Sequence, residues 1–176
     1  SYPQQSWLDP QETLKTNILG SMNVLEAVRH NAPKAKVLMI GSSASYGTQI
    51  DTGPINENNK TNPNSPYGIS KLAQDHLSYI YHKKYKLNII CARPFFLIGP
   101  GKVGDVCSDF AKGIINIEKK KNKSLTVGNL NIVRDFLDYR DGISAMDIIL
   151  EKGNIGEIYN ICGGKGYSLK DIISKM

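Results

Sequence analysis

Short, continuously apolar runs alternate with longer amphipathic segments along this chain. A run that is apolar at successive positions predicts a strand covered on both faces, whereas apolar residues three to four apart predict a helix with one buried face. We expect strands at 37–40, 88–93 and 157–162, helices at 10–30, 66–85, 108–119 and 139–151, a strand, a turn and a second short strand within 125–136, and a helix beginning after 168. This alternation predicts an α/β fold with a parallel, doubly wound sheet.

Two of the expected helices begin with strong start signals. Asp9 and Pro10 precede an acidic residue, which is the order of an N-cap, a first-turn proline and an acid in the first turn. Ser65 precedes Pro66 in the same way. The segment 48–66 holds three prolines and several asparagines, so we expect a long loop there.

The stretch from Ser65 onward carries the candidate chemistry. Tyr67 and Lys71 lie four residues apart, so they leave the same face of a helix one turn apart. Lowering a tyrosine pKa from about 10 to about 7 takes roughly 4 kcal/mol, which a positive charge about 4 Å away supplies at an effective dielectric of about 20. We therefore expect Lys71 to lower the pKa of Tyr67 and make it an acid near neutral pH. Tyr79 and Lys83 repeat the spacing, and we interpret that pair as an exposed helix face.

Hydroxyl side chains add a second part to this candidate site. Ser42, Ser43 and Ser45 follow directly after the strand expected at 37–40. Hydroxyls at the exit of a buried strand, together with a Tyr/Lys helix, would form a set of donors around one substrate oxygen. The sequence therefore favours a site at this strand exit.

Composition narrows the class of partner. The 176 residues are 40% hydrophobic and 22% charged, as in an ordinary soluble globular domain. The net charge is +6, but the lysines are spread along helix faces, and the run 119–123 fits a solvated helix end. Because no aromatic residues are interleaved with the basic ones, we expect no nucleic-acid partner and favour a compact anion such as a nucleotide diphosphate.

Cysteines and histidines indicate neither disulfides nor a metal site. Cys91, Cys107 and Cys162 form no C-x-x-C pair and have no histidine nearby at metal-ligand spacing. We expect buried free thiols, a reducing compartment and a cytoplasmic protein. The longest apolar run, at 87–98, is interrupted by an arginine and a proline and is too short to span a bilayer, so we expect no membrane association.

Three motifs together resemble the extended short-chain dehydrogenase/reductase family, whose members modify nucleotide sugars. They are Ser-Ser-Ala-Ser-Tyr-Gly at 42–47, Ser-Pro-Tyr-Gly-Ile-Ser-Lys at 65–71 and Arg-Pro-Phe-Phe-Leu-Ile-Gly-Pro at 93–100. The resemblance runs through essentially the whole chain. It implies a Rossmann-like sheet with a small substrate-binding lobe, NADP or NAD as the cofactor, and a nucleotide-sugar substrate, with a GDP-sugar favoured.

The resemblance also implies roles for individual residues. Counting back from Tyr46 implies Ser42 as the catalytic hydroxyl, Tyr67 as the proton donor, and Lys71 as the residue that lowers its pKa and holds the nicotinamide ribose. The implied cofactor-binding residues are Tyr67, Lys71, Arg93 and Pro94, and the implied substrate-binding residues are Ser43, Ala44, Phe96, Asn129 and Arg134.

Three features leave alternatives open. Arg134 is either a phosphate-binding guanidinium, as the resemblance implies, or part of a surface ion pair with a neighbouring aspartate. Asn17 interrupts the apolar face of the first helix and is either a satisfied core amide or, as in the family, a support of the active-site hydrogen bonds. The segment 99–104 matches the dinucleotide pattern G-x-G-x-x-G, but it follows a late strand, so we interpret it as a flexible loop that begins the substrate-binding lobe.

The motifs favour one reaction of the family. The resemblance implies that the family's dehydratases carry Thr-Ser-Glu or Thr-Asp-Glu before the Tyr-Gly pair. The matching residues here are Ser43 and Ala44. Without that carboxylate, elimination loses a general base typically worth about 10²–10⁴-fold in rate. The later motifs favour reduction of a 4-keto-6-deoxy GDP-sugar. The alternatives are a nucleotide-sugar 4-epimerase or a GDP-mannose 4,6-dehydratase and, from another class, a non-catalytic nucleotide-sugar binder. Phe96 stands where many relatives carry a substrate-contacting asparagine.

The family pattern also implies internal boundaries and a dimer. We expect residues 1–96 to be the second half of the Rossmann-like domain, 97–134 a substrate-binding lobe, 135–163 a return to the sheet, and 164–176 the start of a C-terminal substrate lobe. The family's first βαβ units have no counterpart here, so we expect an interior fragment that does not bind a dinucleotide tightly by itself. Helices 10–30 and 66–85 resemble the pair through which family members form homodimers.

Overall fold

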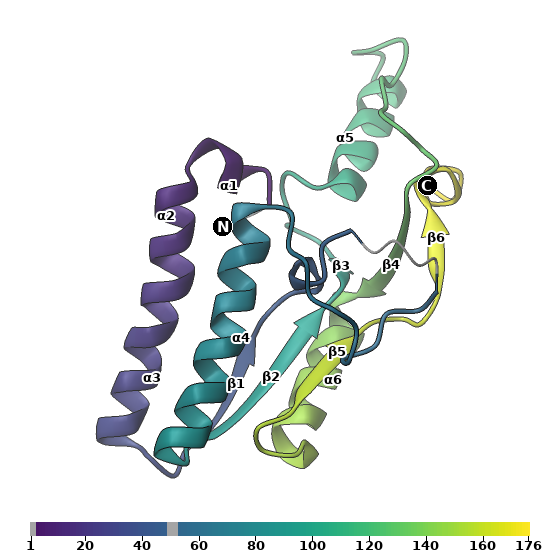
Figure 1. Cartoon of the computed structure of the whole chain (residues 1–176). Helices are drawn as coiled ribbons and strands as arrows, with labels where there is room; N and C mark the ends of the chain where they lie inside the picture. The colour runs from purple at the N-terminus through teal and green to yellow at the C-terminus, as the bar shows by residue number, and fades with distance from the viewer. Residues whose placement is uncertain (1–2, 49–52) are drawn as a thin grey trace. The chain divides into compact units, whose positions relative to one another are not determined.

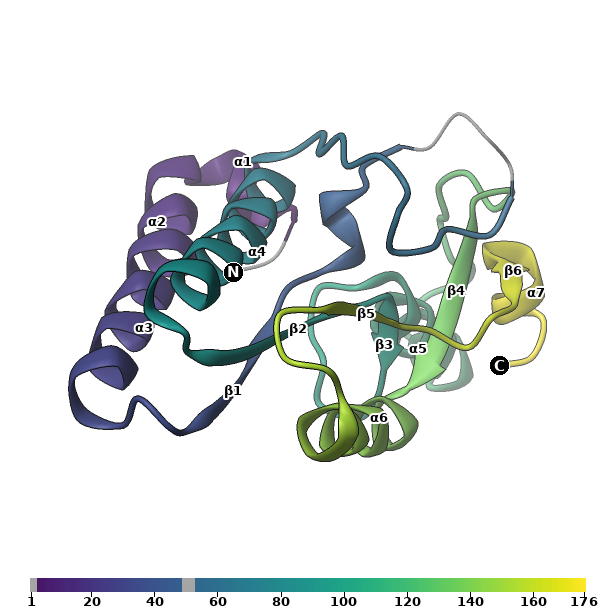
Figure 2. The same ribbon diagram turned by 60° about the horizontal axis from the view of Figure 1, so that its bottom comes forward.

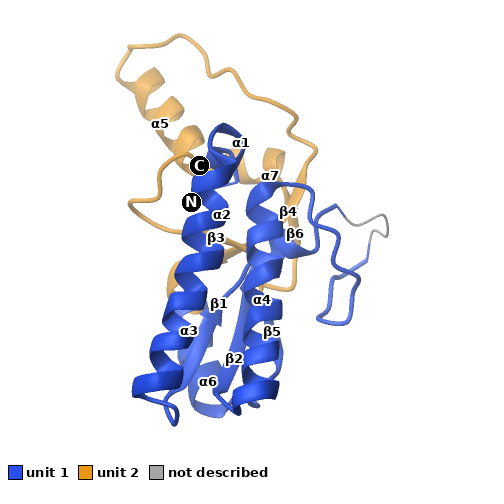
Figure 3. Cartoon of the chain, turned by 60° about the vertical axis from the view of Figure 1, so that its left-hand side comes forward, with its two compact units in different colours: residues 1–95, 142–161 blue, residues 96–141, 162–176 orange. Residues whose placement is uncertain are grey.

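The computed structural model describes residues 3–48 and 53–176. The chain divides into two compact units, residues 1–95 with 142–161 (unit 1) and residues 96–141 with 162–176 (unit 2) (Figure 3). Unit 1 carries the predicted Ser/Tyr/Lys residues, and unit 2 carries most of the predicted substrate-binding residues. The four-part domain division expected from the sequence stays a prediction.

Three parallel strands form the sheet of unit 1. They are β1 (Lys36–Ile40), β2 (Asn88–Pro94) and β5 (Ile158–Ile161), in the order β1-β2-β5 (Figure 1). Lys36 of β1 lies opposite Asn88 of the central strand β2. Every residue of β2 after Asn88 is buried, as its continuous apolar run predicts for a strand covered on both faces. The three strands expected in this unit are confirmed.

Helices cover both faces of this sheet. α1 (Gln5–Leu8) leads into α2 (Pro10–Leu14), the π-helical turn η1 (Lys15–Leu19) and α3 (Gly20–Asn31), and a 3₁₀ turn, η2 (Ser43–Ser45), follows β1 before α4 (Pro66–Tyr85). α3 and α4 lie on one face, and the part of α6 (Tyr139–Lys152) that belongs to unit 1 lies on the other (Figures 1 and 2). The predicted doubly wound α/β fold is confirmed.

The predicted helix starts are confirmed, with one irregularity. Asp9 Oδ1 accepts a hydrogen bond from the Glu12 N–H (2.9 Å), and Ser65 Oγ accepts one from the Gly68 N–H (3.1 Å). The first long helix is nevertheless not continuous α-helix, because the π-helical turn η1 separates α2 from α3. Single π turns within helices are commonly found at functional sites.

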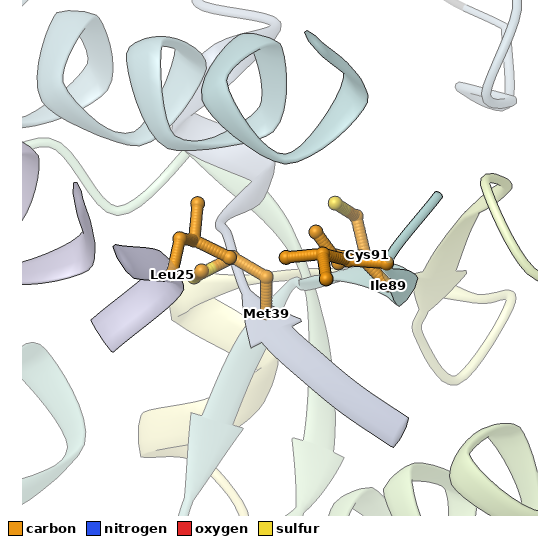
Figure 4. Packing of buried hydrophobic residues seen from close by; sticks show 5 residues of the cluster. Leu25, Met39, Ile89 and Cys91 are labelled. Atoms are coloured by element: carbon orange, nitrogen blue, oxygen red, sulfur yellow. The ribbon is translucent and has the colours of Figure 1, made fainter. Parts of the chain in front are cut away.

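Buried side chains join α3 to the sheet. Leu25 of α3 meets Met39 of β1, and Ile89 and Cys91 of β2 extend the same cluster (Figure 4). Leu25 is fully buried, and burying such a side chain contributes about 1.5–3 kcal/mol. This cluster fixes the face of the sheet on which the candidate site is built.

Unit 2 contains a second small sheet. β3 (Phe96–Ile98) pairs in parallel with β4 (Val133–Asp138), which pairs antiparallel with β6 (Gly166–Ser168). α5 (Val106–Glu118) and α7 (Leu169–Ile173) complete the unit, and Ser168 forms a capping box with Asp171 as the sequence predicts. β3 and β6 are short strands that the sequence analysis does not predict.

One expected strand and one expected thiol environment are wrong. Residues 125–129 form no strand, because Leu125 packs against α5 at Gly113 instead of joining a ladder. Cys162 is exposed because it comes directly after the last residue of β5, whereas the other two cysteines are buried. In the described part of the chain, no helix is both long enough and apolar enough to cross a membrane.

Candidate active site

The carboxyl ends of β1 and β2 lie side by side at one edge of the unit 1 sheet. The Gly41 N–H donates to the Ala92 carbonyl (2.7 Å), which continues the pairing one residue beyond β1. Ser42 is extended (φ −168°, ψ 148°), and its Oγ accepts a hydrogen bond from the Ala44 N–H (3.1 Å). The Ser42 hydroxyl is thereby fixed where the strand ends.

The first turn of α4 packs closely against η2. A Cβ at Gly68 would lie 2.7 Å from the Ala44 carbonyl oxygen and 3.0 Å from Pro63 Cβ. Those distances leave no room for a methyl group without a shift of the backbone. The missing side chain of Gly68 therefore allows the first turn of α4, with Tyr67, to pack closely against η2.

The hydroxyl of Ser42 lies close enough to the phenol of Tyr67 to influence its pKa. Burial raises the pKa of Tyr67, and the Ser42 hydroxyl opposes this by a smaller amount. The expectation that Lys71 brings this pKa down to neutrality is wrong in this structure, because the cost of burying a phenolate dominates. Tyr67 is therefore a neutral phenol near pH 7, which is the form that can donate a proton.

Lys71 lies between the phenol and the end of β1. Its Nζ donates to the Ile40 carbonyl (3.0 Å) and lies 5.8 Å from the centre of the Tyr67 ring. Burial lowers the pKa of Lys71, and the negative charge of Asp75 opposes this. The structure thus brings the three predicted catalytic side chains together within unit 1.

The π-helical turn η1 connects to the backbone of Tyr67. Asn17 lies in η1, and its Nδ2 donates to Ser70 Oγ (2.8 Å). The Ser70 hydroxyl, which is fully buried, donates in turn to the Tyr67 carbonyl (2.7 Å). The two alternatives for Asn17 are therefore compatible, because the interior amide is satisfied by the chain of hydrogen bonds that holds the start of α4.

Arg93 and Pro94, predicted to bind the cofactor, are buried at the end of β2. Arg93 Nε pairs with Asp75 Oδ2 at 2.8 Å, and its guanidinium lies 4.8 Å from the centre of the Tyr46 ring. Burial raises the pKa of Asp75, and the charge of Arg93 opposes this. The sequence analysis misses Asp75, although its position four residues after Lys71 puts it on the same face of α4.

The predicted substrate-binding residues Ser43 and Ala44 are half-buried in η2. None of the three residues of this turn carries a carboxylate. This turn therefore has no general base of its own, although the motif expected of the family's dehydratases, Thr-Ser-Glu or Thr-Asp-Glu, carries a carboxylate there. This absence concerns the turn itself, since the loop that follows carries Glu57.

The described part of the long loop after η2 is attached to β5. The Asn160 N–H donates to Glu57 Oε1 (2.7 Å), and Asn160 Nδ2 donates to the Ile55 carbonyl (3.2 Å). The hydroxyl of the fully buried Tyr46 donates to Asn160 Oδ1 (2.8 Å). The loop predicted at 48–66 is confirmed over its described residues, and residues 49–52 lie outside them.

The remaining predicted substrate-binding residues belong to unit 2. The ring of Phe96 packs edge-on against Phe136, with 5.0 Å between centroids. Asn129 Oδ1 accepts a hydrogen bond from the Asn131 N–H (2.9 Å). Arg134 is exposed and donates to the neighbouring Val133 carbonyl (2.8 Å). Their roles in substrate binding stay predictions.

The ion-pair alternative for Arg134 finds little support in unit 2. Asp138 pairs with Arg140 at 2.9 Å. Asp135 accepts hydrogen bonds from the Gly163 and Lys165 N–H groups (2.7 and 3.1 Å). Both neighbouring aspartates are therefore engaged by other groups.

Unit 2 also contains a pocket of about 310 Å³. Residues 98–102, Asp105 and α5 as far as Ile115 line it. Lys102 and Lys112 contribute positive charge, and Asp105, 3.7 Å from the Lys102 ammonium, contributes negative charge. The segment 99–104 is a loop, as the sequence analysis interprets it. Within residues 3–48 and 53–176, no three His, Cys, Asp or Glu side chains gather to form a metal site.

Comparison with known proteins identifies relatives of the whole chain. The family model described as GDP-mannose 4,6 dehydratase matches residues 1–176. The GDP-6-deoxy-D-mannose reductase of Pseudomonas aeruginosa is 33% identical over 176 residues, which cover 98% of this chain and 58% of that protein. A dTDP-glucose 4,6-dehydratase of Xanthomonas campestris is 31% identical, with 93% of this chain and 48% of that protein covered.

Solved structures also resemble the chain. The structure of RMD from Pseudomonas aeruginosa complexed with NADPH has a TM-score of 0.94 at 33% identity, covering 99% of this chain and 61% of that one. UDP-glucuronic acid 4-epimerase from Bacillus cereus, in complex with UDP-glucuronic acid and NAD, has a TM-score of 0.86 at 33% identity, covering 99% and 55%. The chain thus spans about half to three fifths of the length of these relatives. With its parallel sheet and a family-model match over all 176 of its residues, this chain belongs to the GDP-mannose 4,6 dehydratase family.

Proposed function

We propose that this chain is part of an NAD(P)-dependent enzyme that reduces a 4-keto-6-deoxy GDP-sugar. The observation that carries the proposal is the grouping of Ser42, Tyr67 and Lys71 at the carboxyl edge of a parallel sheet. Ligands of open α/β sheets bind at that edge. The similarity to a GDP-6-deoxy-D-mannose reductase supports the choice of substrate class.

The three side chains suit proton delivery to a ketone oxygen. Tyr67 is neutral near pH 7, since a phenol ordinarily ionises near pH 10 and burial raises this pKa further, so it can donate its proton as charge develops on that oxygen. The Ser42 hydroxyl, close to the phenol, donates a hydrogen bond to the same oxygen. The ammonium of Lys71, which lies 5.8 Å from the centre of the Tyr67 ring, then faces the phenolate that remains and stabilises its charge.

A nicotinamide cofactor, when bound, supplies the hydride. The donor set of the chain fits such a group, because Tyr67 and Lys71 are both half-buried residues and their hydroxyl and ammonium groups can bond ribose hydroxyls. NADPH and NAD are each bound in a similar solved structure. We propose that Tyr67 and Lys71 contact the cofactor, with Arg93 and Pro94 in support.

The nucleotide part of the substrate is proposed to bind unit 2. The pocket of about 310 Å³ has the size of a small-molecule site; its Lys112 suits a diphosphate, and its Lys102 is paired with Asp105 at 3.7 Å. Arg134 is exposed and carries a guanidinium whose fork matches phosphate oxygens. Phe96, Asn129, Ser43 and Ala44 remain the proposed substrate contacts named by the family pattern.

Reduction is favoured over elimination because the η2 turn carries no carboxylate. A general base contributes about 10²–10⁴-fold, so its loss weighs heavily against a dehydratase. A nucleotide-sugar 4-epimerase is the second candidate, favoured by the similar solved epimerase. An epimerase regenerates its cofactor, whereas a reductase consumes one NAD(P)H for each sugar reduced.

We further propose a cytoplasmic homodimer formed through helices 10–30 and 66–85. Large apolar side chains stand exposed on these helices, among them Leu19 (47%), Val24 (53%), Ile69 (51%) and Ile80 (53%). An exposed apolar surface of this kind is typical of an interface. Replacing Val24 and Ile80 by aspartate is expected to give monomers in sedimentation, and an unchanged dimer would rule out this interface.

The experiment for the enzyme proposal uses the full-length protein. Purified protein is mixed with a 4-keto-6-deoxy GDP-sugar and NADPH, and both cofactor oxidation and sugar product are followed. Tyr67→Phe is expected to lower kcat by at least about 10²-fold with an unchanged thermal midpoint, because the proton donor is lost. Tyr79→Phe, on the repeated Tyr/Lys pair of the same helix, is the control and is expected to keep the wild-type rate.

Each outcome separates the candidates. Stoichiometric oxidation of NADPH supports a reductase, whereas interconversion of sugars without net oxidation supports an epimerase. A wild-type rate for Tyr67→Phe would remove the proposed role of the phenol.

A further inference from the structure

A buried carboxylate lies beneath the candidate catalytic pair. Tyr67, Lys71 and Asp75 are spaced four residues apart on α4, so they form one stripe that runs down the helix. Asp75 is 4% exposed, and its residue type is rarely buried without a partner. The proposed mechanism uses the first two members of this stripe and leaves the third without a role.

Asp75 contacts the two strands that form the site's edge. Its Oδ2 accepts a hydrogen bond from Arg93 Nε of β2 (2.8 Å), and both side chains are less than 5% exposed. Its Oδ1 lies against the end of β1, where a Cβ added to Gly41 would be only 2.7 Å away. That oxygen has no hydrogen-bond partner among the described residues.

Lys71 and Asp75 engage adjacent residues at the end of β1. The ammonium of Lys71 donates to the Ile40 carbonyl (3.0 Å), and the carboxylate of Asp75 lies against Gly41, the next residue. Ser42 follows directly. The opposite charges of α4 therefore lie one helical turn apart, at the backbone that leads into the candidate catalytic hydroxyl.

Charged and titratable groups surround this stripe on α4 itself, at the end of β1 and on β2. Lys71 faces Asp75 and Tyr67 on α4, with Ser42 after β1. Asp75 also faces His76 on α4, and Arg93 and Cys91 on β2. The charge that opposes the effect of burial at Lys71 is that of Asp75.

We propose that Asp75 is a positioning residue that holds the Lys71 ammonium at the end of β1, while Arg93 holds the carboxylate in place. This proposal rests on the proposed reductase function, in which the ammonium stabilises the Tyr67 phenolate. The competing explanation is that the Asp75–Arg93 pair serves packing alone, as many buried ion pairs do.

The test compares variants of the full-length protein that keep the shape of the pair. Asp75→Asn removes the carboxylate charge but leaves Arg93 buried and unpaired, which can prevent folding. The double variant Asp75→Asn with Arg93→Gln removes both charges and keeps the interior neutral. Asp75→Glu keeps the charge and tests rescue.

The first readout is the titration of Lys71, followed as the pH dependence of its labelling by an amine reagent. We expect the labelling midpoint to fall in the double variant, by less than about one pH unit, because Asp75 is the charge that opposes burial at Lys71 while Arg93→Gln removes an opposite charge beside it. Asp75→Glu keeps the carboxylate, so its Lys71 labelling midpoint is expected to stay close to the wild-type value. Lys83, the exposed lysine of the repeated pair, is the internal control, and its midpoint is expected to stay unchanged.

The second readout is the pH profile of kcat with NADPH and the keto-sugar. We expect the alkaline limb to move to lower pH by the same amount, with little change in KM for the sugar. A folded double variant with wild-type Lys71 labelling and a wild-type profile would overturn the proposal and leave a packing role. If the wild-type protein reduces no keto-sugar, the proposed function fails, and the labelling of Lys71 still decides this proposal because it needs no substrate.

Discussion

The close approach of α4 to η2 leads to a sharp prediction for Gly68→Ala. In most helices this change is favourable, because alanine is preferred over glycine by up to about 1 kcal/mol. Here the added methyl would lie 2.7 Å from the Ala44 carbonyl oxygen, and ordinary contact begins near 3.4 Å. The η2 backbone must therefore retreat by about 0.7 Å, and overpacking of this kind costs about 1–3 kcal/mol. We expect a net loss of stability of up to about 2 kcal/mol.

The same shift of η2 is also expected to lower kcat. Ser42 begins the η2 turn and lies close to the phenol of Tyr67, the residue next to Gly68, so a shift of η2 misaligns the two hydroxyls. A misplacement of about 1 Å costs about 10²-fold in rate, so a shift of about 0.7 Å is expected to lower kcat by roughly 10–100-fold. The assay is NADPH oxidation with a 4-keto-6-deoxy GDP-sugar by the full-length protein, alongside thermal unfolding.

Gly20→Ala is the matched control. Gly20 is also helical, and a Cβ there would have no atom within 4 Å. We expect this variant to gain up to about 1 kcal/mol and to keep its rate. If Gly68→Ala is stabilised to the same extent and keeps wild-type kcat, the reasoning from close packing at η2 is refuted.

Three further predictions concern stability. Hydrogen bonds from Arg29 and then Tyr81 lower the pKa of Glu26 to about 2 from an ordinary value of about 4.5. The contribution of Glu26 to stability is therefore fully present above about pH 4.5 and is lost as the pH falls through about 2. Glu26→Gln should flatten the thermal midpoint against pH across this range, and an unchanged slope would contradict the assignment. Leu25→Ala should cost about 2–5 kcal/mol in denaturant unfolding, since its side chain is fully buried, and a smaller loss would mean that the core closes around it. Tyr46→Phe should cost about 1–3 kcal/mol and speed proteolysis within 53–65, because Asn160 Oδ1 loses its donor.

Local signals in the sequence account well for where helices begin. Asp9, Ser65 and Ser168 each accept a backbone N–H within their own helix start, so the information lies within four residues of chain. The buried strands are also predictable, because a strand covered on both faces needs an apolar residue at nearly every position.

The errors arise where distant residues decide the structure. Leu125 is apolar in a strand-like context, but the surface of α5 at Gly113 takes its side chain. The π-helical turn at Lys15–Leu19 depends on contacts with α4, such as the bond from Asn17 to Ser70, which no local pattern encodes.

The candidate site was predictable in its members but not in its electrostatics. Spacing places Tyr67 and Lys71 on one face of a helix, and the family pattern adds Ser42. Whether a phenol's pKa rises or falls depends on how deeply it is buried, which spacing does not reveal. Asp75 was missed because its importance comes from Arg93, eighteen residues later on another element.

The π-helical turn has a consequence for how the first helices tolerate changes in length. A π turn holds one residue more than an α turn, and each residue rotates a helix by about 100°. Because the wider turn absorbs its extra residue, deleting one residue within Lys15–Leu19 would let the helix continue as regular α-helix with later side chains near their present angle, and Leu25 would still meet the sheet. Deleting one residue between Gly20 and Leu25 would instead turn Leu25 by about 100° away from the sheet. The irregular turn is therefore the place at which these helices can change length by one residue without changing which face they bury.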